Sequence, residues 1–489
     1  MQMRIILVLL ITISINFKTS ASYNLNQNCK EAWVMLMELE IDKAQDLLAK
    51  EISQNPENYY AYYLQQSCES YTLLINSGEE EYESFLLNHE KRREIMNDKD
   101  EESPYYLACK AEMDLQVGIF NIIYGSKISG LRMAYSAYKN TYRNLEVHPE
   151  FKQSIKLDGF FNVAVSNLPP FVKFAVSAFG VSGNTEYGLK LLNENYSSQR
   201  NIKGINAESA LFVILAAKLN KTPDLVYDFV NSLDSSISKT FIHTYFRANI
   251  SYRTGHNEDA LETLSTLDIS NNTTRDIIYS YMMGKILLRK LDYNAGYFFE
   301  RYLSFDNKRE YVKEMNYKLA CHFLLNNNIA EFERHKKICL KEGNNINERD
   351  REALYDAKLD YTPDINLLKA HLLLDGGYDK LYSDAIESYK SSDNNFLPYN
   401  LEFHLLEGTA CERQGNHSLA TFHFEKVIQL GSDEDYYFAS EAALKLGEIY
   451  ESENNVEKAE LYYEKAIKLY DSDYYEYIDD KATKALKGL

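Results

Sequence analysis

The sequence is short of the residues that interrupt regular structure or cross-link small folds. Its 489 residues include 8 Pro, 20 Gly, one Trp and six Cys, and no two cysteines form a CxxC motif. These counts exclude a collagen-like chain and a disulfide-dense scaffold. An excess of basic residues is also lacking, because 53 Lys and Arg stand against 72 Asp and Glu, a net charge of −19. Duplex nucleic acid and anionic bilayers are repelled on average by such a chain, and we expect no nucleic-acid partner.

Apolar residues, by contrast, are plentiful. Hydrophobic residues make up 45% of the chain, enough to close a core, which argues against disorder. They recur at i, i+3, i+4 and i+7 with little Gly or Pro inside the runs, a pattern that predicts helix after helix. The chain also has 40 tyrosines, an unusually large number. We expect many of them to fill gaps between helices, and others to be exposed as contact area for a peptide or glycan.

The first 22 residues are typical of a secretory signal peptide. Arg4 supplies a positive charge, residues 5–17 are apolar, and Ser20, Ala21 and Ser22 are small residues suited to cleavage. The apolar run is shorter than the ~20 residues of a membrane span, although an uncleaved N-terminal anchor is the alternative. Cys29 lies too far downstream to accept a lipid anchor. We therefore expect an exported protein, periplasmic or extracellular.

The six cysteines allow two interpretations. An even number in an oxidising compartment permits disulfides, and Cys321 and Cys339 are close enough to face each other across a helical hairpin. Unpaired thiols buried as small apolar groups are the favoured alternative. The full set is Cys29, Cys68, Cys109, Cys321, Cys339 and Cys411.

A repeat pattern is clearest near the C terminus. Residues 440–471 contain Ala443-x2-Leu446-Gly447-x2-Tyr450, a polar turn, and then Ala459-x3-Tyr463-x2-Ala466. This resembles the tetratricopeptide repeat, a pair of helices with a period of 34 residues, and only the Trp and the late Pro of its signature are missing. Small residues suit the close approach of the two helices, and large ones fill the groove to a neighbouring hairpin.

Degenerate copies of this pattern occur upstream. They comprise Gly408, Cys411, Ala420 and Phe424; Gly284, Leu287, Ala295 and Phe299; Ala248, Ala260 and Leu264; and Ala44, Leu48 and Pro56. One hairpin cannot bury its own apolar face, so the copies should stack. We predict an all-α solenoid of tetratricopeptide-type helical hairpins, forming a right-handed superhelix with an irregular apolar helical insertion.

The insertion lies in the middle of the chain. From Asp158 to Gly183 the only charges are Asp158 and Lys173, and Pro169-Pro170 should break the segment into two helices. It is similar to a stretch of the tetratricopeptide repeat protein 39 and inclusion-body clearance family. The matching residues are Gly159, Phe161, Asn162, Ser166, Leu168, Pro169, Pro170, Gly180, Gly183, Gly188 and Leu189.

The resemblance implies an all-helical, non-enzymatic adaptor, linked in some members to lipid handling and protein clearance. Asn184 stands where the family usually has an acid, and an exported N terminus differs from its intracellular members. The residues themselves allow two interpretations. The segment is either a buried helix pair with a Pro-Pro corner, or an exposed apolar hairpin that contacts a membrane or an apolar ligand through Phe160, Phe161, Phe171 and Phe174.

The sequence contains no complete motif for phosphate binding, metal binding or catalysis. Residues 183–190 resemble the phosphate-loop motif GxxxxGK[ST], but the Lys stands one position after its place in the motif and no Ser or Thr follows it. There is no HExxH pair for zinc, and His417 and His423, which could meet within one hairpin, are more typical of packed or solvated histidines. We expect no catalytic, cofactor-binding or metal-binding residues, no cofactor and no enzymatic activity.

Five segments are expected: a signal peptide (1–22), N-terminal helical repeats (23–126), the irregular segment (127–200), tetratricopeptide-like repeats (201–345) and C-terminal repeats (346–489). The function predicted from these features is that of an exported scaffold binding a protein or peptide on its concave face, where Tyr and acidic side chains select basic or polar partners. The alternative is a lipid- or apolar-ligand-associated envelope protein that uses the Phe-rich segment 157–183. The oligomeric state is left open.

Overall fold

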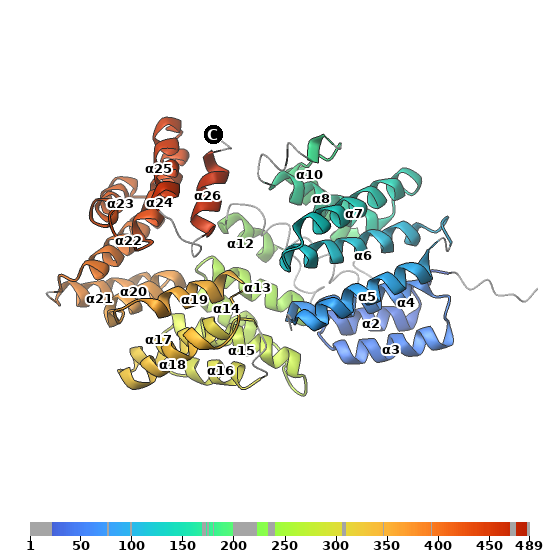
Figure 1. The fold of residues 1–489 in the computed structure, drawn as a ribbon, viewed down its shortest axis with the longest axis horizontal. Coiled ribbons are helices and arrows are strands. Elements are labelled where there is room, and N and C mark those ends of the chain that lie inside the picture. Colours follow the sequence, from blue (N-terminus) through green and yellow to red (C-terminus); the bar gives the residue numbers. More distant parts are fainter. Residues whose placement is uncertain are drawn as a thin grey trace, which may run out of the picture. The chain divides into compact units, whose positions relative to one another are not determined.

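The computed structural model of the chain describes residues 22–75, 78–97, 100–168, 173, 176–178, 180–198, 223–232, 240–305, 310–345, 347–392, 394–469 and 476–486. Across these residues the regular elements are helices and no strand occurs, which confirms the predicted all-α class (Figure 1). Residues 1–21 of the expected signal peptide lie outside the described residues, as do Pro169, Pro170, Phe171 and Phe174.

The described chain forms two compact units, with the division at Asp158 and Gly159. The first unit contains the described residues 22–74 and 79–158, and the second contains those from 159 onward together with Ile75 and Gly78. The five segments expected from the sequence stay a prediction.

The first unit consists of antiparallel helices. Helix α2 pairs with α3, and α6 pairs with α7 along most of their length. The helices are α2 (Gln27–Met37), α3 (Ile41–Gln54), α4 (Tyr59–Ile75), α5 (Glu79–Met96), α6 (Pro104–Ile123), α7 (Lys127–Val147) and the first half of α8 (Lys152–Ser166). Its interior includes the only tryptophan, Trp33, which is 3% exposed and contacts the rings of Tyr60 and Tyr63.

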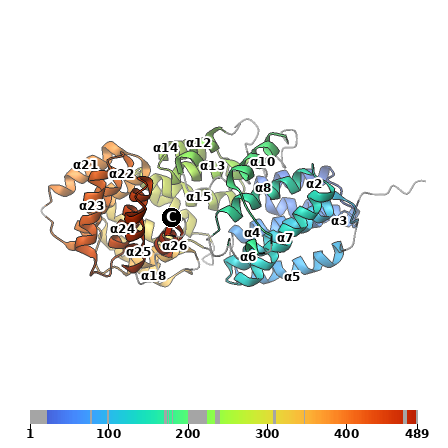
Figure 2. The same cartoon turned by 90° about the horizontal axis from the view of Figure 1, so that it is seen from above.

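The second unit is a series of helical hairpins. The paired helices are α13 (Phe241–Arg253) with α14 (Asn257–Ser265), α15 (Thr273–Arg289) with α16 (Ala295–Leu303), α17 (Val312–Leu325) with α18 (Ile329–Lys341), α20 (Ile365–Gly376) with α21 (Asp379–Lys390), α22 (Leu397–Arg413) with α23 (His417–Gly431), and α24 (Phe438–Ser452) with α25 (Val456–Lys468). Both views show α22 to α25 side by side (Figures 1 and 2). Among the described residues of this unit, the helices outside these pairs are the second half of α8, α10 (Thr185–Ser198), α12 (Pro223–Ser232), α19 (Glu348–Lys358) and α26 (Glu476–Leu486).

The hairpins share one turn geometry. In most of them a residue with positive φ stands two positions before the second helix, where the chain must reverse sharply. These residues are Leu39, Gly255, Asn327, Gly377, Gly415 and Asn454. An asparagine then caps the second helix in three cases, because the side chains of Asn328, Asn416 and Asn455 accept a hydrogen bond from a backbone N–H of the first turn. The turn sequences therefore set both the reversal and the helix start.

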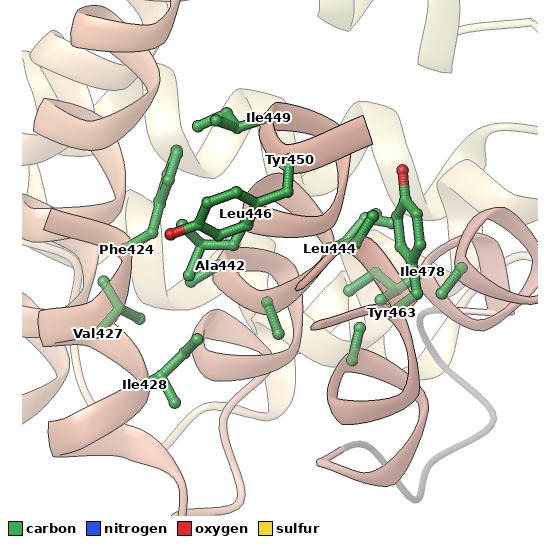
Figure 3. Close-up of a cluster of buried hydrophobic side chains, with 14 of the residues drawn as sticks. Phe424, Val427, Ile428, Ala442, Leu444, Leu446, Ile449, Tyr450, Tyr463 and Ile478 are labelled. Atoms are coloured by element: carbon green, nitrogen blue, oxygen red, sulfur yellow. The ribbon is translucent and has the colours of Figure 1, made fainter. Parts of the chain in front are cut away.

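A glycine and an aromatic ring fix the distance between the two helices in three hairpins. A Cβ atom on Gly284 would lie 2.6 Å from the Phe299 ring, and one on Gly408 would lie 2.6 Å from the Phe424 ring. The same contact joins Gly447 to the ring of Tyr463, at 2.5 Å from Cδ1. Phe424 and Tyr463 belong to one cluster of buried side chains that spans α23 to α26 (Figure 3). Only glycine fits opposite these rings.

The segment that resembles the family motif contains a close helix crossing. A Cβ atom on Gly159 of α8 would lie 2.7 Å from the Leu192 side chain, and one on Gly188 of α10 would lie 2.6 Å from the Gly159 carbonyl oxygen. Asn162 Oδ1 accepts a hydrogen bond of 3.2 Å from the Asn184 N–H. Phe161 is 5% exposed and Phe160 is half-buried. The described part of this segment is thus a packed helix pair, and the apolar-ligand alternative is not favoured.

None of the six cysteines forms a disulfide, and five of them are buried. Cys321 and Cys339 lie in the same small cluster without a disulfide, and the Cys339 thiol donates to the carbonyl oxygen of Ala353 at 3.4 Å. Burial raises the pKa of both thiols to about 12. The structure therefore has the buried unpaired thiols that the sequence favoured, and the Cys321–Cys339 disulfide is not present.

Candidate functional site

The first helices of the hairpins in the second unit present a continuous set of charged and tyrosine side chains. Helix α15 contacts α13, α17 and α20, and α22 contacts both α20 and α24. Each helix buries small and apolar residues against its own partner helix. Some of its polar side chains pair with those of another first helix, as Lys445 of α24 does with Glu412 of α22 at 3.3 Å. We call the polar residues of α13, α15, α17, α20, α22 and α24, with those of α19, the first-helix surface.

Glu314 of α17 is the centre of one cluster on this surface. Lys285 of α15 places its Nζ 2.8 Å from Glu314 Oε1, and the Tyr281 hydroxyl donates to Glu314 Oε2 at 2.8 Å. Burial by itself raises the pKa of Glu314, but the charges of Lys285 and Lys318 outweigh it, so the pKa is lowered. The carboxylate is therefore ionised, and its contacts with Lys285 and Tyr281 hold it in one geometry.

Asp375 at the end of α20 is the centre of a second cluster. Arg289 of α15 is 3.0 Å from Asp375 Oδ2, and Arg413 of α22 is 3.8 Å from Oδ1. The Arg289 guanidinium also lies over the ring of Tyr252, 3.7 Å from its centroid. One carboxylate thus joins the three first helices α15, α20 and α22, in a geometry that suits the planar guanidinium.

Lys318 and Asp356 are among the charged groups on this surface that have no such partner. The side chains of Lys318 on α17 and Asp356 on α19 form no hydrogen bond or ion pair within the described residues, and both are half-buried. Burial opposes the charge of Lys318, but Tyr252 and Glu314 raise its pKa above the ordinary value. Burial raises the pKa of Asp356 to about 7. These two groups are available to pair with charges on a bound molecule.

Among the described residues no group of three or more His, Cys, Asp or Glu side chains is placed to hold a metal ion. In the same part of the chain, no helix combines the length and the hydropathy needed to cross a membrane. What the arrangement offers is a set of fixed charges of both signs, interleaved with tyrosines such as Tyr245, Tyr281 and Tyr437.

The structure places the repeat residues predicted from the sequence inside the hairpins, not on this surface. Ala44, Ala260, Ala295, Ala420, Ala443, Leu446, Ala459 and Ala466 are all 0% exposed, Tyr463 is 1% and Tyr450 is 8% exposed. Gly284, Gly408 and Gly447 face rings, as described above.

The residues of the family motif lie in several different environments. Gly159, Phe161, Asn162 and Gly188 lie at the crossing of α8 and α10, Ser166 and Leu168 are half-buried, and Leu189 packs against a nearby core. Gly180 is exposed with nothing near its Cβ position, and Gly183 fits tightly against the Asn162 carbonyl oxygen and the Ser166 N–H.

Sequence reasoning did not find the charged residues of the first-helix surface. It predicted tyrosines and acidic groups on a binding face in general, but it named none of Lys285, Arg289, Glu314, Lys318, Asp356 and Asp375. The sequence does contain a signal for these residues, because charged residues recur in each first helix although the helix face toward the second helix is apolar. The pairing of His417 with His423 is not present, because His417 Nδ1 lies 3.2 Å from Glu453 Oε1 instead.

Residues 440–473 match the family described as the tetratricopeptide repeat. This segment of the chain is therefore a tetratricopeptide repeat, and the coarser part of the resemblance stated from the sequence holds. The finer resemblance, to the tetratricopeptide repeat protein 39 and inclusion-body clearance family, stays a prediction. A comparison with curated proteins finds no significant match.

Several solved structures are similar to the chain over most of its length. They include a monomeric mutant of IFIT1 with m7Gppp-AAAA, at 13% identity, covering 92% of this chain and 91% of that chain with a TM-score of 0.35. Yeast Tom70 is 13% identical over 93% of this chain and 95% of its own, with a TM-score of 0.27. The APC/C hetero-tetramer Cut9–Hcn1 is 12% identical over 94% and 90%, with a TM-score of 0.26.

Proposed function

We propose that the protein is an exported, non-enzymatic helical-repeat scaffold that binds a protein or an extended peptide along the first-helix surface. The observation that carries the proposal is the set of ion pairs between first helices, Lys285 with Glu314 and Arg289 with Asp375. On the same surface Lys318 and Asp356 form no ion pair of their own. Helical repeats commonly bind through extended surfaces of this kind, by many modest contacts on a pre-formed framework.

The charges suggest which partners are favoured. A net charge of −19 attracts a basic partner at long range, and the tyrosines supply contact area at low entropic cost. Fixed ion pairs such as Lys285–Glu314 keep the surface in one conformation before binding. Pre-organisation of this kind reduces the entropic cost of association.

A charge reversal on one hairpin tests this proposal. Lys318→Glu changes the first-helix surface, whereas Lys337→Glu makes the same change on α18, at an exposed lysine of the second helix. A tagged protein incubated with the secreted or envelope fraction of its own source should retain a specific protein, quantified by mass spectrometry. We expect Lys318→Glu to reduce retention at least tenfold and Lys337→Glu to leave it unchanged.

Equal retention by both variants and the unaltered protein, with circular dichroism showing intact helices, contradicts binding at this surface. Retention should also fall as salt rises from 0.05 to 0.5 M, roughly the range over which the Debye length shrinks severalfold.

Export is tested on the mature N terminus. Cleavage after Ser22 predicts that the secreted protein begins at Tyr23, which intact-mass measurement detects directly. A protein that keeps residues 1–22 and stays in the membrane fraction supports the uncleaved anchor instead.

A further inference from the structure

Two histidines meet between the helices of the hairpin α22 and α23. His404 on α22 and His423 on α23 place their Nδ1 atoms 2.9 Å apart, with ring centroids 5.2 Å apart. Both imidazoles therefore direct the same nitrogen toward one point. In the metal-free pair, one ring must donate its proton to the lone pair of the other.

The surroundings hold this geometry. The Phe403 ring is 5.1 Å from the His404 ring, and the Phe422 ring is 5.3 Å from that of His423. Glu407, one helical turn after His404, adds a fixed negative charge nearby, since it accepts hydrogen bonds from Tyr382 at 2.8 Å and from Lys390 at 3.2 Å. The contact is thus a supported arrangement and not an encounter of two mobile side chains.

Burial and nearby cations disfavour the protonated, charged form of both rings. Burial, followed by the charge of a protonated His423 and of Lys426, lowers the pKa of His404 to about 4. Burial also lowers the pKa of His423, and Lys390 acts in the same direction while Glu407 opposes it. A neutral imidazole keeps one ring nitrogen with a lone pair, and that nitrogen is the atom that binds a metal ion.

We propose that His404 and His423 form a two-ligand site for a divalent transition-metal ion, bound through the two Nδ1 atoms with water in the remaining positions. Tetrahedral zinc with Zn–N bonds of 2.0–2.1 Å separates two ligand nitrogens by about 3.3 Å. The rings would have to separate by only about 0.4 Å from their present distance to admit the ion. The ring that carries its proton on Nδ1 shifts it to Nε2 through solvent when the ion binds, so both rings stay neutral and no net proton is released. Glu407 offsets part of the added charge.

Two protein ligands make an open, exchangeable site, in keeping with the absence of any three-ligand cluster in the described part of the chain. Imidazole donors suit copper, nickel and zinc, and affinity should follow the order Cu²⁺ above Ni²⁺ and Zn²⁺. Mg²⁺ and Ca²⁺ prefer oxygen ligands and should not bind here.

The test is calorimetric titration of the chelator-treated full-length protein, free of any histidine tag, with Cu²⁺ and Zn²⁺. His404→Gln and His423→Gln should each lower the affinity of the tightest site at least tenfold, while His417→Gln should not. His417 is the matched control, because it lies in the same hairpin and pairs with Glu453. Unchanged affinity in a folded His404→Gln variant overturns the proposal.

A second measurement on the unaltered protein covers the case in which a variant fails to fold. Diethylpyrocarbonate modifies accessible imidazoles, and mass spectrometry locates each modified residue. Zn²⁺ should reduce the modification of His404 severalfold and leave that of His417 unchanged. Equal modification of His404 with and without saturating Zn²⁺ also overturns the proposal.

Discussion

The first unit and the C-terminal hairpins are both built from antiparallel helices, but they fix their contacts by different means. In α22 to α25 the interior is apolar, and a glycine opposite an aromatic ring sets the spacing in each hairpin. In the first unit the interior of α4, α5, α6 and α8 contains charged and amide side chains. In the C-terminal hairpins the matching shapes of glycine and ring determine which helices pack together. In the first unit, paired polar groups determine it.

The polar interior of the first unit depends on helix α6. Glu112 accepts a hydrogen bond from the Tyr63 hydroxyl and pairs with Lys156 Nζ at 3.0 Å, and both charged residues are less than 5% exposed. Asp114, fully buried, lies 3.2 Å from Arg93 Nη1. Such groups are tolerated inside a protein only while each has its partner, so they penalise any other arrangement of these helices.

The largest effect is expected from breaking the Glu112–Lys156 pair. Lys156→Met leaves a buried carboxylate with only Tyr63 as a partner, and should lower the free energy of unfolding by about 3–5 kcal/mol. Trp33 reports on this unit because its ring centroid lies 6.2 Å from that of Tyr63. Urea unfolding followed by tryptophan fluorescence measures the change.

The double variant Glu112→Leu with Lys156→Met is the control. It removes both charges and should recover most of the lost stability. Lys445→Met, in the second unit, breaks partly exposed pairs with Glu412 and Glu448 and should leave the tryptophan transition unchanged. A Lys156→Met midpoint close to that of the unaltered protein means that this pair does not stabilise the unit.

The two interiors should also differ in how the stability of the fold depends on pH. His89 of the first unit is 2% exposed, and burial, together with Arg93 and Arg92, lowers its pKa to about 4. Its Nδ1 lies 3.0 Å from Gln66 Oε1, and Nε2 is 4.0 Å from Asp114. Because the folded pKa is below the unfolded value of about 6.5, His89 stabilises the fold above pH 6.5, and this contribution is lost as the pH falls through 4.

His89→Gln should therefore flatten the acid side of the stability curve by up to about 3 kcal/mol between pH 6.5 and 4, as followed by Trp33 fluorescence in urea. Burial raises the pKa of Asp114, so its own contribution runs in the opposite direction, but it is common to both proteins and largely cancels in the difference. His335→Gln, at a similarly shifted histidine of the second unit, is the matched control for the tryptophan signal. Parallel curves for His89→Gln and the unaltered protein contradict the assignment.

How much the sequence predicts follows from this comparison. Ala443, Gly447, Ala459 and Tyr463 are spaced by the helix period, so a single sequence displays their complementarity. Glu112 and Lys156 are 44 positions apart, and nothing in their local sequence marks them as partners, since charged residues are usually solvated. The first-helix surface was missed for the same reason. The sequence favoured His417 and His423 as packed or solvated histidines and did not name His404, which the packing of the hairpin brings against His423.

The smallest effect, and the most specific, concerns how small and large residues are matched across a hairpin. Gly408 stands sixteen positions before Phe424, and Gly447 sixteen before Tyr463. At the same spacing Ala248 precedes Leu264, and these two share a buried cluster. Glycine thus accompanies an aromatic ring and alanine accompanies a leucine, which keeps the combined volume nearly constant.

Gly408→Ala alone should destabilise the second unit by about 1 kcal/mol, because the added methyl meets the Phe424 ring and outweighs the gain in helix propensity. Phe424→Leu alone should cost about 1 kcal/mol or more through the cavity that it leaves. In the Phe424→Leu background, however, Gly408→Ala should stabilise by about 1 kcal/mol, since the obstruction is gone and the propensity gain remains. Urea unfolding followed by circular dichroism measures all four proteins, and simple additivity of the two single effects would mean that the ring does not set the spacing of the helices.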